Sequence, residues 1–436
     1  MKKLFLGVLM LVVCSLFLIG CTPSEKEYET HELTEVAEKE SRKCFNFFWG
    51  TANLDKESPS YGLIPDRFPS NGLASIASVG YGLTAFPIGV ERGWIKYEAA
   101  QERALTTLLS MEKLQRVNGF YYHFYYEKNH NIAAEIGLPA KGTEVSVIDT
   151  AIFLCGALFA GEYFGGEVAE VANRIYAEVN WPWYVEPGVN QFYMGYDAET
   201  NTFSGNWDVY GEQLMVYFLA AGSPTYPIDK SVYDSFRRIE GTYGEDTFIS
   251  SWFGSIFTYQ FSHAWIDFAR IEDADGVNWF DNSVKATYAN YNYCQDYSYK
   301  YKTFAAGGWG LTACDGPDGY NGQYGSAPSG TDNTAHFTDG TVALAGAIGS
   351  IVFAPELVLD TMDYYYTALD GKLFGGYGFY DSYNIDRNYI ANDVIGIDKG
   401  ISLLMIENYR DGIVWKTFME LDCMEKAIDV LEFEYV

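Results

Sequence analysis

Apolar residues recur along most of this chain at the spacing of three and four positions that is typical of α-helices. These segments run for roughly 12 to 20 residues, and loops rich in Gly, Pro and aromatic residues separate them. The pattern predicts about twelve helices, at residues 32–51, 74–92, 97–115, 145–164, 167–179, 207–221, 229–239, 248–269, 279–300, 341–353, 356–369 and 397–410.

Two of these segments, 145–164 and 214–221, are apolar on nearly all sides, which indicates helices buried inside a larger helical assembly. Strand signals are few and short; the clearest, residues 119–126, is one arm of a small hairpin. A repeated strand–helix alternation is absent, which argues against a parallel α/β sheet. The sequence therefore predicts an all-α fold, a double-layered α/α barrel that forms one domain over residues 41–436.

The first 40 residues differ from the rest of the chain. Lys2 and Lys3 precede the apolar stretch 4–19, and Leu18-Ile19-Gly20-Cys21 resembles the site cut by the lipoprotein signal peptidase. We expect residues 1–20 to be a signal peptide and Cys21 to carry lipid; the alternative is an ordinary secretory signal. The polar residues 21–40 are expected to form a tether. The predicted location is a membrane, through the lipid alone, on the periplasmic or cell-surface side.

The amino-acid composition limits the classes of ligand that this protein can bind. The formal net charge of −29 disfavours nucleic acid and anionic polysaccharides, which both call for basic surfaces. Aromatic residues make up 17% of the chain, with 36 Tyr, and many lie in Gly-rich segments, where they suit neutral sugar rings. The alternative for most tyrosines is packing with a satisfied hydroxyl. We expect a monomer that binds a neutral glucan.

The cysteines are too dispersed for a disulfide framework or a zinc site, although one bridge stays open in an oxidising compartment. Apart from Cys14 and Cys21 they are Cys44, Cys155, Cys294, Cys314 and Cys423. The chain also lacks a Gly-x-Ser-x-Gly elbow, a phosphate-binding loop and a His-Glu-x-x-His pair. We therefore expect neither a metal nor another cofactor.

The chemistry that remains is that of carboxyl groups in apolar surroundings. Glu212 stands at the start of a strongly apolar helix, where desolvation would raise its pKa and keep it protonated as a general acid needs. An equally good reading is a first-turn Glu that the helix dipole favours. Asp149 lies among Val147, Ile148 and Ile152, so it needs a polar partner; binding or structural anchoring is favoured over catalysis.

Asp393 and Asp398 lie just before the helix predicted at 401–410. Asp398 is either the N-cap of that helix or a base that activates water. Two acids from separate segments are what glycoside hydrolysis requires. The loops 307–320 and 375–381 contain Trp309, Asp315 and Tyr377. Their Gly content predicts that they lie outside the core and contact sugar; ordinary loop packing is the alternative.

Ten motifs across residues 40–436 together resemble the bacterial glycoamylase-like domain of glycoside hydrolase family 144, the β-1,2-glucanases. They are Gly62–Arg67, Ser75–Thr84, Tyr122–Phe124, Glu144–Ala151, Trp207–Glu212, Ala221–Thr225, Gln260–Phe268, Trp309–Tyr320, Asp339–Ala343 and Gly396–Glu407. After Ala343 this chain departs from the Pro-Thr-Ala-Ala that is frequent in the family and has Leu344-Ala345-Gly346-Ala347.

The resemblance implies an (α/α)6 barrel and metal-free hydrolysis of β-1,2-glucan, with inversion, to sophorose or short oligosaccharides. It assigns Glu212 as the acid and Asp398 as the leading base, with Asp393 and Asp149 in reserve. The residues expected to line sugar subsites are Arg67, His123, Trp207, His263, Trp309, Asp315 and Tyr377.

Four other functions remain open. A surface lipoprotein that binds glycan without cutting it would have the aromatic residues but no use for a desolvated acid. Hydrolysis of another neutral glucan linkage needs the same two carboxyl groups. A polysaccharide lyase would act on uronates and calls for positive charge, which this acidic chain lacks. Transglycosylation, as in related enzymes that make cyclic glucans, is the fourth.

Overall fold

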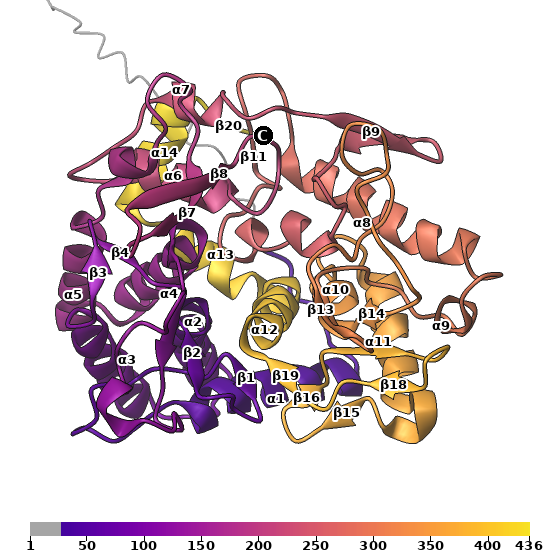
Figure 1. The fold of residues 1–436 in the computed structure, drawn as a ribbon, viewed down its shortest axis with the longest axis horizontal. Coiled ribbons are helices and arrows are strands. Elements are labelled where there is room, and N and C mark those ends of the chain that lie inside the picture. Colours follow the sequence, from indigo (N-terminus) through magenta and orange to yellow (C-terminus); the bar gives the residue numbers. More distant parts are fainter. Residues whose placement is uncertain (1–27) are drawn as a thin grey trace, which may run out of the picture.

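The computed structural model describes residues 28–436, so the predicted signal peptide and Cys21 lie outside the described residues. The helices form two layers around a central axis, with α12 near the middle of Figure 1. The inner layer consists of helices that are almost wholly buried: α2 (Ile76–Glu91), α4 (Val147–Phe164), α6 (Leu214–Gly222), α10 (Leu344–Ile348) and α12 (Gly396–Asp411).

The sixth inner position is occupied by two short 3-10 turns, Ile256–Tyr259 and Ser262–Ala264, which contact α8 and α12. The helices that cover the inner layer keep a polar face toward solvent. They are α1 (Glu35–Thr51), α3 (Tyr97–Met111), α5 (Gly166–Ala177), α8 (Trp279–Asp296), α11 (Pro355–Gly371) and α14 (Asp422–Leu431), with the short α7 (Lys230–Tyr233), α9 (Lys302–Ala305) and α13 (Ile413–Phe418).

The inner helices approach one another closely. A Cβ atom on Gly156 of α4 would lie 1.9 Å from the carbonyl oxygen of Gly80 in α2, so only glycine allows this crossing. The apolar helix α4 is long enough to span a membrane by length and composition, but 83% of it is buried inside the protein. It is therefore the core helix that its all-round apolar sequence predicted.

The strands are short, and all their pairings are antiparallel. The two-stranded pairs are β1 (Arg67–Phe68) with β19 (Val394–Ile395), β2 (Leu73–Ser75) with β5 (Phe124–Tyr126), β3 (Arg116–Val117) with β4 (Phe120–Tyr121), β9 (Glu240–Tyr243) with β10 (Asp246–Ile249), β11 (Ile271–Glu272) with β20 (Glu434–Tyr435), β12 (Cys314–Gly316) with β13 (Gly319–Asn321), and β15 (Phe374–Gly375) with β16 (Gly378–Phe379). The three-stranded sheets are β6 (Val145–Ser146), β7 (Tyr193–Asp197) and β8 (Thr202–Asn206), and β14 (Val342–Ala343), β17 (Ser382–Asn384) and β18 (Tyr389–Ile390).

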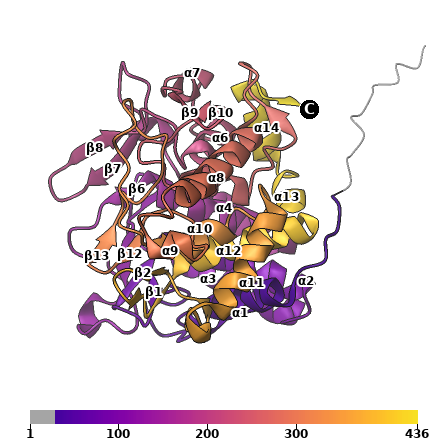
Figure 2. The same cartoon turned by 90° about the vertical axis from the view of Figure 1, so that its right-hand side faces the viewer.

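Most of these strands gather at one end of the barrel, on the left of Figure 2, whereas α13 and the start of the described chain lie on the opposite side. The inner helices α2, α4, α10 and α12 each begin directly after a short strand, so their N-terminal ends point to the strand-rich end. Helix N-termini carry partial positive charge, which favours carboxylates there. This end of the barrel is where the candidate site lies.

Three local predictions were wrong. Residues 248–269 form β10 and the 3-10 turns rather than one helix, and only four or five residues are helical in α7 and α10. Residues 28–40, predicted to be tether, pack on the domain. There Tyr28 donates to Asp267 (2.7 Å), and the buried Glu40 accepts from Lys399 (2.7 Å). The polar composition hid this because the contacts are made by a hydroxyl and a carboxylate whose partners lie far along the chain.

Candidate active site

A cavity of about 470 Å³ opens at the strand-rich end, beside the first residues of α6. Its lining includes Glu212 and Trp207, both predicted site residues, and the exposed aromatic side chains Trp252 and Tyr320. Trp207 has a buried indole N–H without a protein partner, so it can donate to a ligand hydroxyl. A carboxyl group among aromatic rings and one free donor suits a sugar.

Glu212 precedes α6 and is held through its backbone. The Ser262 hydroxyl donates to the Glu212 carbonyl (2.7 Å) and accepts from the Met215 N–H (3.0 Å). Burial raises the pKa of Glu212 to about 8, and the nearby Asp149 carboxylate adds to the rise while His123 opposes it. Glu212 is therefore protonated at neutral pH, which is the state that a general acid requires.

Asp149 and His123 form a pair next to Glu212. Ser146, the N-cap of α4, donates to Asp149 Oδ2 (2.6 Å), and His123 Nε2 lies 3.6 Å from Asp149 Oδ1. Burial alone would lower the pKa of His123, but the carboxylates of Asp149 and Glu144 outweigh it and raise that pKa to about 9. Both predicted residues thus face the site, and Asp149 is already engaged by two partners.

Arg67 of β1 forms ion pairs with three carboxylates. Its guanidinium lies 2.7 Å from Asp315, 2.9 Å from Asp393 and 3.1 Å from Asp66. The pKa of Asp393 is raised by burial, and Arg67 limits the rise. Arg67, Asp315 and Asp393 are predicted site residues that the structure brings together, and this bonding makes Asp393 a poorer base than a carboxylate without a cation partner.

Asp398 is the third residue of α12. Burial raises its pKa to about 6, while a hydrogen bond from Asp381 and the charges of Lys399 and Arg67 oppose the rise. Asp398 is therefore ionised above about pH 6, as a base must be.

Glu212 and Asp398 both lie near Tyr320 and Tyr81, since each carboxylate raises the pKa of both tyrosines. Tyr320 is 62% exposed, yet partial desolvation raises its pKa, and Asp398 and Glu212 both add to the rise. The buried Tyr81 of α2 behaves in the same way, and its hydroxyl has no protein partner. The structure thus places one protonated and one ionised acid around the strand-rich end of the barrel.

The family model described as "Putative glucoamylase", or Glycoamylase, matches residues 204–422, half of the chain. The chain belongs to the Glycoamylase family. An exo β-1,2-glucooligosaccharide sophorohydrolase of Parabacteroides distasonis is 25% identical over 422 residues, which cover 89% of this chain and 56% of that protein. The chain thus spans about half the length of this relative.

Solved structures agree on the fold. A Bacteroides uniformis protein described in the same words as the family superposes with a TM-score of 0.80 at 27% identity, over 93% of this chain and 99% of that one. An endo-β-1,2-glucanase from Chitinophaga pinensis gives a TM-score of 0.77 at 24% identity, over 92% and 98%. The predicted (α/α)6 barrel is confirmed.

For two residues of this Glycoamylase member, the predicted role in a sugar subsite is wrong. His263 is 1% exposed, bonds Ser283 (2.9 Å) and has a pKa lowered by burial to about 3. Trp309 is fully buried, and its indole N–H donates to Thr361 (2.8 Å). The loop around Trp309 is rich in Gly because it crosses the core: a Cβ on Gly310 would lie 2.7 Å from backbone.

Tyr377 lies away from the paired acids, edge-on to the exposed Phe68 with ring centroids 5.0 Å apart. Phe68 follows Arg67 in β1, so this aromatic pair stands beside the carboxylate cluster. The sequence interpretation passed over Asp381 and Asp66, although both lie inside segments that it singled out. It also passed over Trp252 and Tyr320, and no local signal separates these from other exposed aromatic residues.

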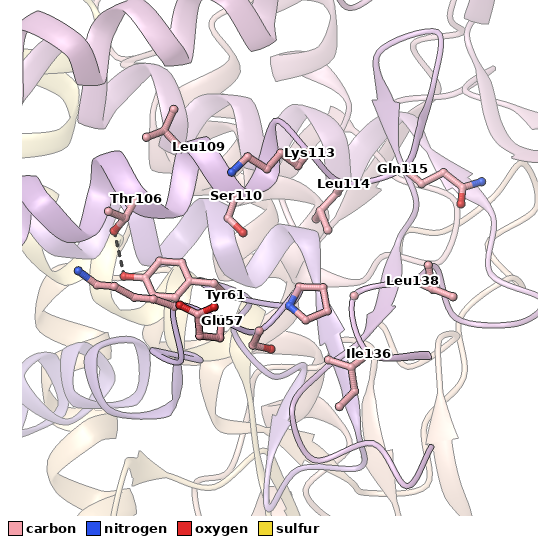
Figure 3. Close-up of a pocket in the computed structure, with 14 residues that line it drawn as sticks. Glu57, Tyr61, Thr106, Leu109, Ser110, Lys113, Leu114, Gln115, Ile136 and Leu138 are labelled. Atoms are coloured by element: carbon pink, nitrogen blue, oxygen red, sulfur yellow. Dashed lines mark hydrogen bonds between the residues drawn. The ribbon is translucent and has the colours of Figure 1, made fainter. Parts of the chain in front are cut away.

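The thiols of residues 28–436 and a further cavity there do not offer the same chemistry. No group of three or more His, Cys, Asp or Glu side chains within this range is arranged to hold a metal ion, and the five cysteines here are free thiols. A second cavity, of about 690 Å³, lies between α3 and the segments 56–61 and 136–138 (Figure 3). Glu57 is the one carboxylate in its lining, so a pair of acids is lacking there.

Replacing Arg67 should destabilise the protein in a pH-dependent way. In Arg67→Met, the carboxylates of Asp66, Asp315 and Asp393 lose their cation, and the folded-state pKa values of Asp66 and Asp393, which burial already raises, rise further above the unfolded values. Stability is then lost as the pH rises through those values. We expect a loss of about 3 kcal/mol in the free energy of unfolding at pH 8 and a clearly smaller loss at pH 5, by urea denaturation.

The matched control is Arg174→Met, which breaks the pair with Glu112 on the surface (3.0 Å). It should leave the free energy of unfolding almost unchanged at either pH, because solvent screens this surface pair. An equal loss at pH 5 and pH 8 for Arg67→Met would mean that packing rather than charge explains the effect.

Proposed function

We propose that this protein is a glycoside hydrolase that cleaves β-1,2-glucan to sophorose or other short oligosaccharides. The observation that carries the proposal is the pair Glu212 and Asp398, two acids that lie near the same two tyrosines and have pKa values of about 8 and about 6. Environments that hold one carboxyl protonated and another ionised are how acid and base roles are separated in glycosidases.

The choice of linkage is supported by the relatives. The Parabacteroides distasonis sophorohydrolase is 25% identical to this chain over an alignment that covers 89% of the chain. The family description names a glucoamylase, an enzyme of another glucan, but the matched structures from Chitinophaga pinensis and Parabacteroides distasonis are described as β-1,2-glucanases. Those two are under 25% identical and support the fold alone, so the linkage is a matter for experiment.

In the proposed reaction, Glu212 gives its proton to the glucosidic oxygen as the bond to the anomeric carbon breaks. A water molecule attacks that carbon from the other face, and its proton passes to Asp398. A single displacement by water inverts the anomeric configuration. Trp207, Trp252 and Tyr320 offer aromatic surfaces to the sugar rings, and the charged groups around Arg67 and His123 offer partners for hydroxyls.

Replacing the acid tests the reaction directly. Glu212→Gln keeps the shape of the side chain but cannot give up a proton, so we expect kcat on linear β-1,2-glucan to fall by roughly 10²–10⁴-fold. The measurement is reducing-sugar release, with β-1,3- and α-1,4-glucans in parallel. Glu245→Gln in the exposed turn between β9 and β10 is the control and should keep wild-type turnover.

The outcomes separate the competing functions. Wild-type turnover in Glu212→Gln would overturn the acid assignment. Binding of β-1,2-glucan by the wild type without any product would favour the surface glycan-binding alternative, and product from another glucan only would change the linkage.

The activity should show a bell-shaped dependence on pH. Asp398 must be ionised, so activity is lost as the pH falls through about 6, and Glu212 must be protonated, so activity is lost as the pH rises through about 8. The profile of kcat/KM on a defined β-1,2-oligosaccharide should therefore peak between these values. A flat profile from pH 5 to pH 9 would contradict both roles.

We also propose that lipid on Cys21 holds the protein to a membrane, with the barrel in the periplasm or at the cell surface. The start of the described chain supports this orientation, because Tyr28 packs against Trp415 of α13, on the side of the barrel opposite the strand-rich end (Figure 2). The site would then open away from the membrane.

Cys21→Ala should move the protein from the membrane fraction to the soluble fraction in a bacterial host, with unchanged activity on β-1,2-glucan. Cys14→Ala is the matched control and should leave the protein with the membranes. If Cys21→Ala stays in the membrane fraction, another mode of attachment holds it there.

A further inference from the structure

Asp381 and Asp398 are two acids whose carboxyl groups are hydrogen-bonded to each other. Asp381 follows β16 and is 1% exposed, whereas Asp398 begins α12 and is partly exposed. Two ionised carboxylates are acceptors only and cannot bond each other. The contact therefore requires one proton between them.

The oxygens that hold this proton follow from their other partners. Asp381 Oδ2 accepts the Asp315 N–H (2.8 Å), which leaves Asp381 Oδ1. Asp381 Oδ1 and Asp398 Oδ2 are both buried and have no other hydrogen-bond partner. A buried polar atom without a partner costs about 1–3 kcal/mol, and one shared proton satisfies both oxygens.

Three segments fix Asp381, two through its backbone and one through its side chain. Its N–H donates to the Asp393 carbonyl (3.1 Å), and its carbonyl accepts from Leu344 (3.0 Å) at the start of α10. The Asp315 hairpin is the third contact. Asp381 thus presents its carboxyl to Asp398 from a rigid position.

The charged surroundings place the negative charge on Asp398. Lys399 and Arg67 both stabilise the ionised form of Asp398 and lower its pKa, whereas burial and the Asp398 charge raise the pKa of Asp381 well above its usual range. The other titratable groups facing the pair are neutral at pH 7 or are paired with Arg67; they are Cys44, Tyr81, Cys314, Asp315, Tyr320 and Tyr389.

We infer that Asp381 is a positioning residue for the base: its protonated carboxyl donates to Asp398 Oδ2, fixes that side chain and leaves Asp398 Oδ1 to take the proton of the attacking water. The inference rests on the proposed function, in which Asp398 is the base. In that step the water O–H bond breaks, its oxygen bonds the anomeric carbon, and its proton goes to Asp398. The proton of Asp381 stays in place throughout.

Two replacements of Asp381 separate this role from simple packing. Asp381→Asn keeps an acceptor for the Asp315 N–H and a donor for Asp398, so kcat should fall less than about tenfold and the acidic limb of the pH profile should stay near pH 6. Asp381→Leu has a similar shape without the donor. Its kcat should fall about 10²-fold, and its acidic limb should move up by about one pH unit or more.

A residue that matters only for folding would give another result. Both variants would then unfold at lower temperature, and the acidic limb would not move in either. That result overturns the inference, as does a folded Asp381→Asn that is inactive, because the catalytic charge would then belong to Asp381.

A measurement without substrate keeps the inference separate from the proposed function. In a Glu212→Gln background, the infrared C=O stretch of a protonated carboxyl should be present at pH 7 and absent after Asp381→Asn is added. A wild type without β-1,2-glucanase activity refutes the function but not the shared proton. Activity that survives Asp398→Asn refutes the base, and a missing infrared band refutes the shared proton.

Discussion

The ion pairs of Arg67 hold together parts of the chain that are far apart in sequence. Its guanidinium contacts Asp66 beside it, Asp315 in the β12–β13 hairpin and Asp393 before β19, and β19 itself pairs with β1. Several carboxylates can share one end of the barrel because this cation offsets their repulsion and because the inner helices point their N-termini there. The base helix α12 takes its place from the same contacts.

Burial and the neighbouring charges give each acid a different protonation state, and with it a different chemical role. After burial, the Asp149 carboxylate has the largest effect on the pKa of Glu212, which rises to about 8. Asp398 stands next to Lys399 and near Arg67, which limit the rise to about 6. Asp381 is buried more deeply than Asp398 and keeps its proton. Three carboxyl groups of one chemical kind are thus prepared for three states by their surroundings alone.

Helices were predicted well where the apolar pattern is long and all-round, as in α4, because burial on every side shows in the local sequence. The pattern misled at 248–269, where apolar residues fill an inner position as 3-10 turns and not as a helix. It also misled at Trp309, where glycines suggested an exposed loop, and the subsite role expected for His263 from the family resemblance was wrong. Those glycines serve close packing inside the core, and His263 finds its partner, Ser283, in α8.

By itself the sequence determined the class of fold, the inner helices and the candidacy of Glu212 and Asp398, because apolar periodicity and the apolar setting of an acid are local properties. Only the tertiary structure decided which acids meet. The contact of Asp381 with Asp398, the grouping around Arg67 and the packing of residues 28–40 join segments that are far apart in the chain. A pKa depends on burial and on neighbouring charges in space, and neither can be read along the sequence.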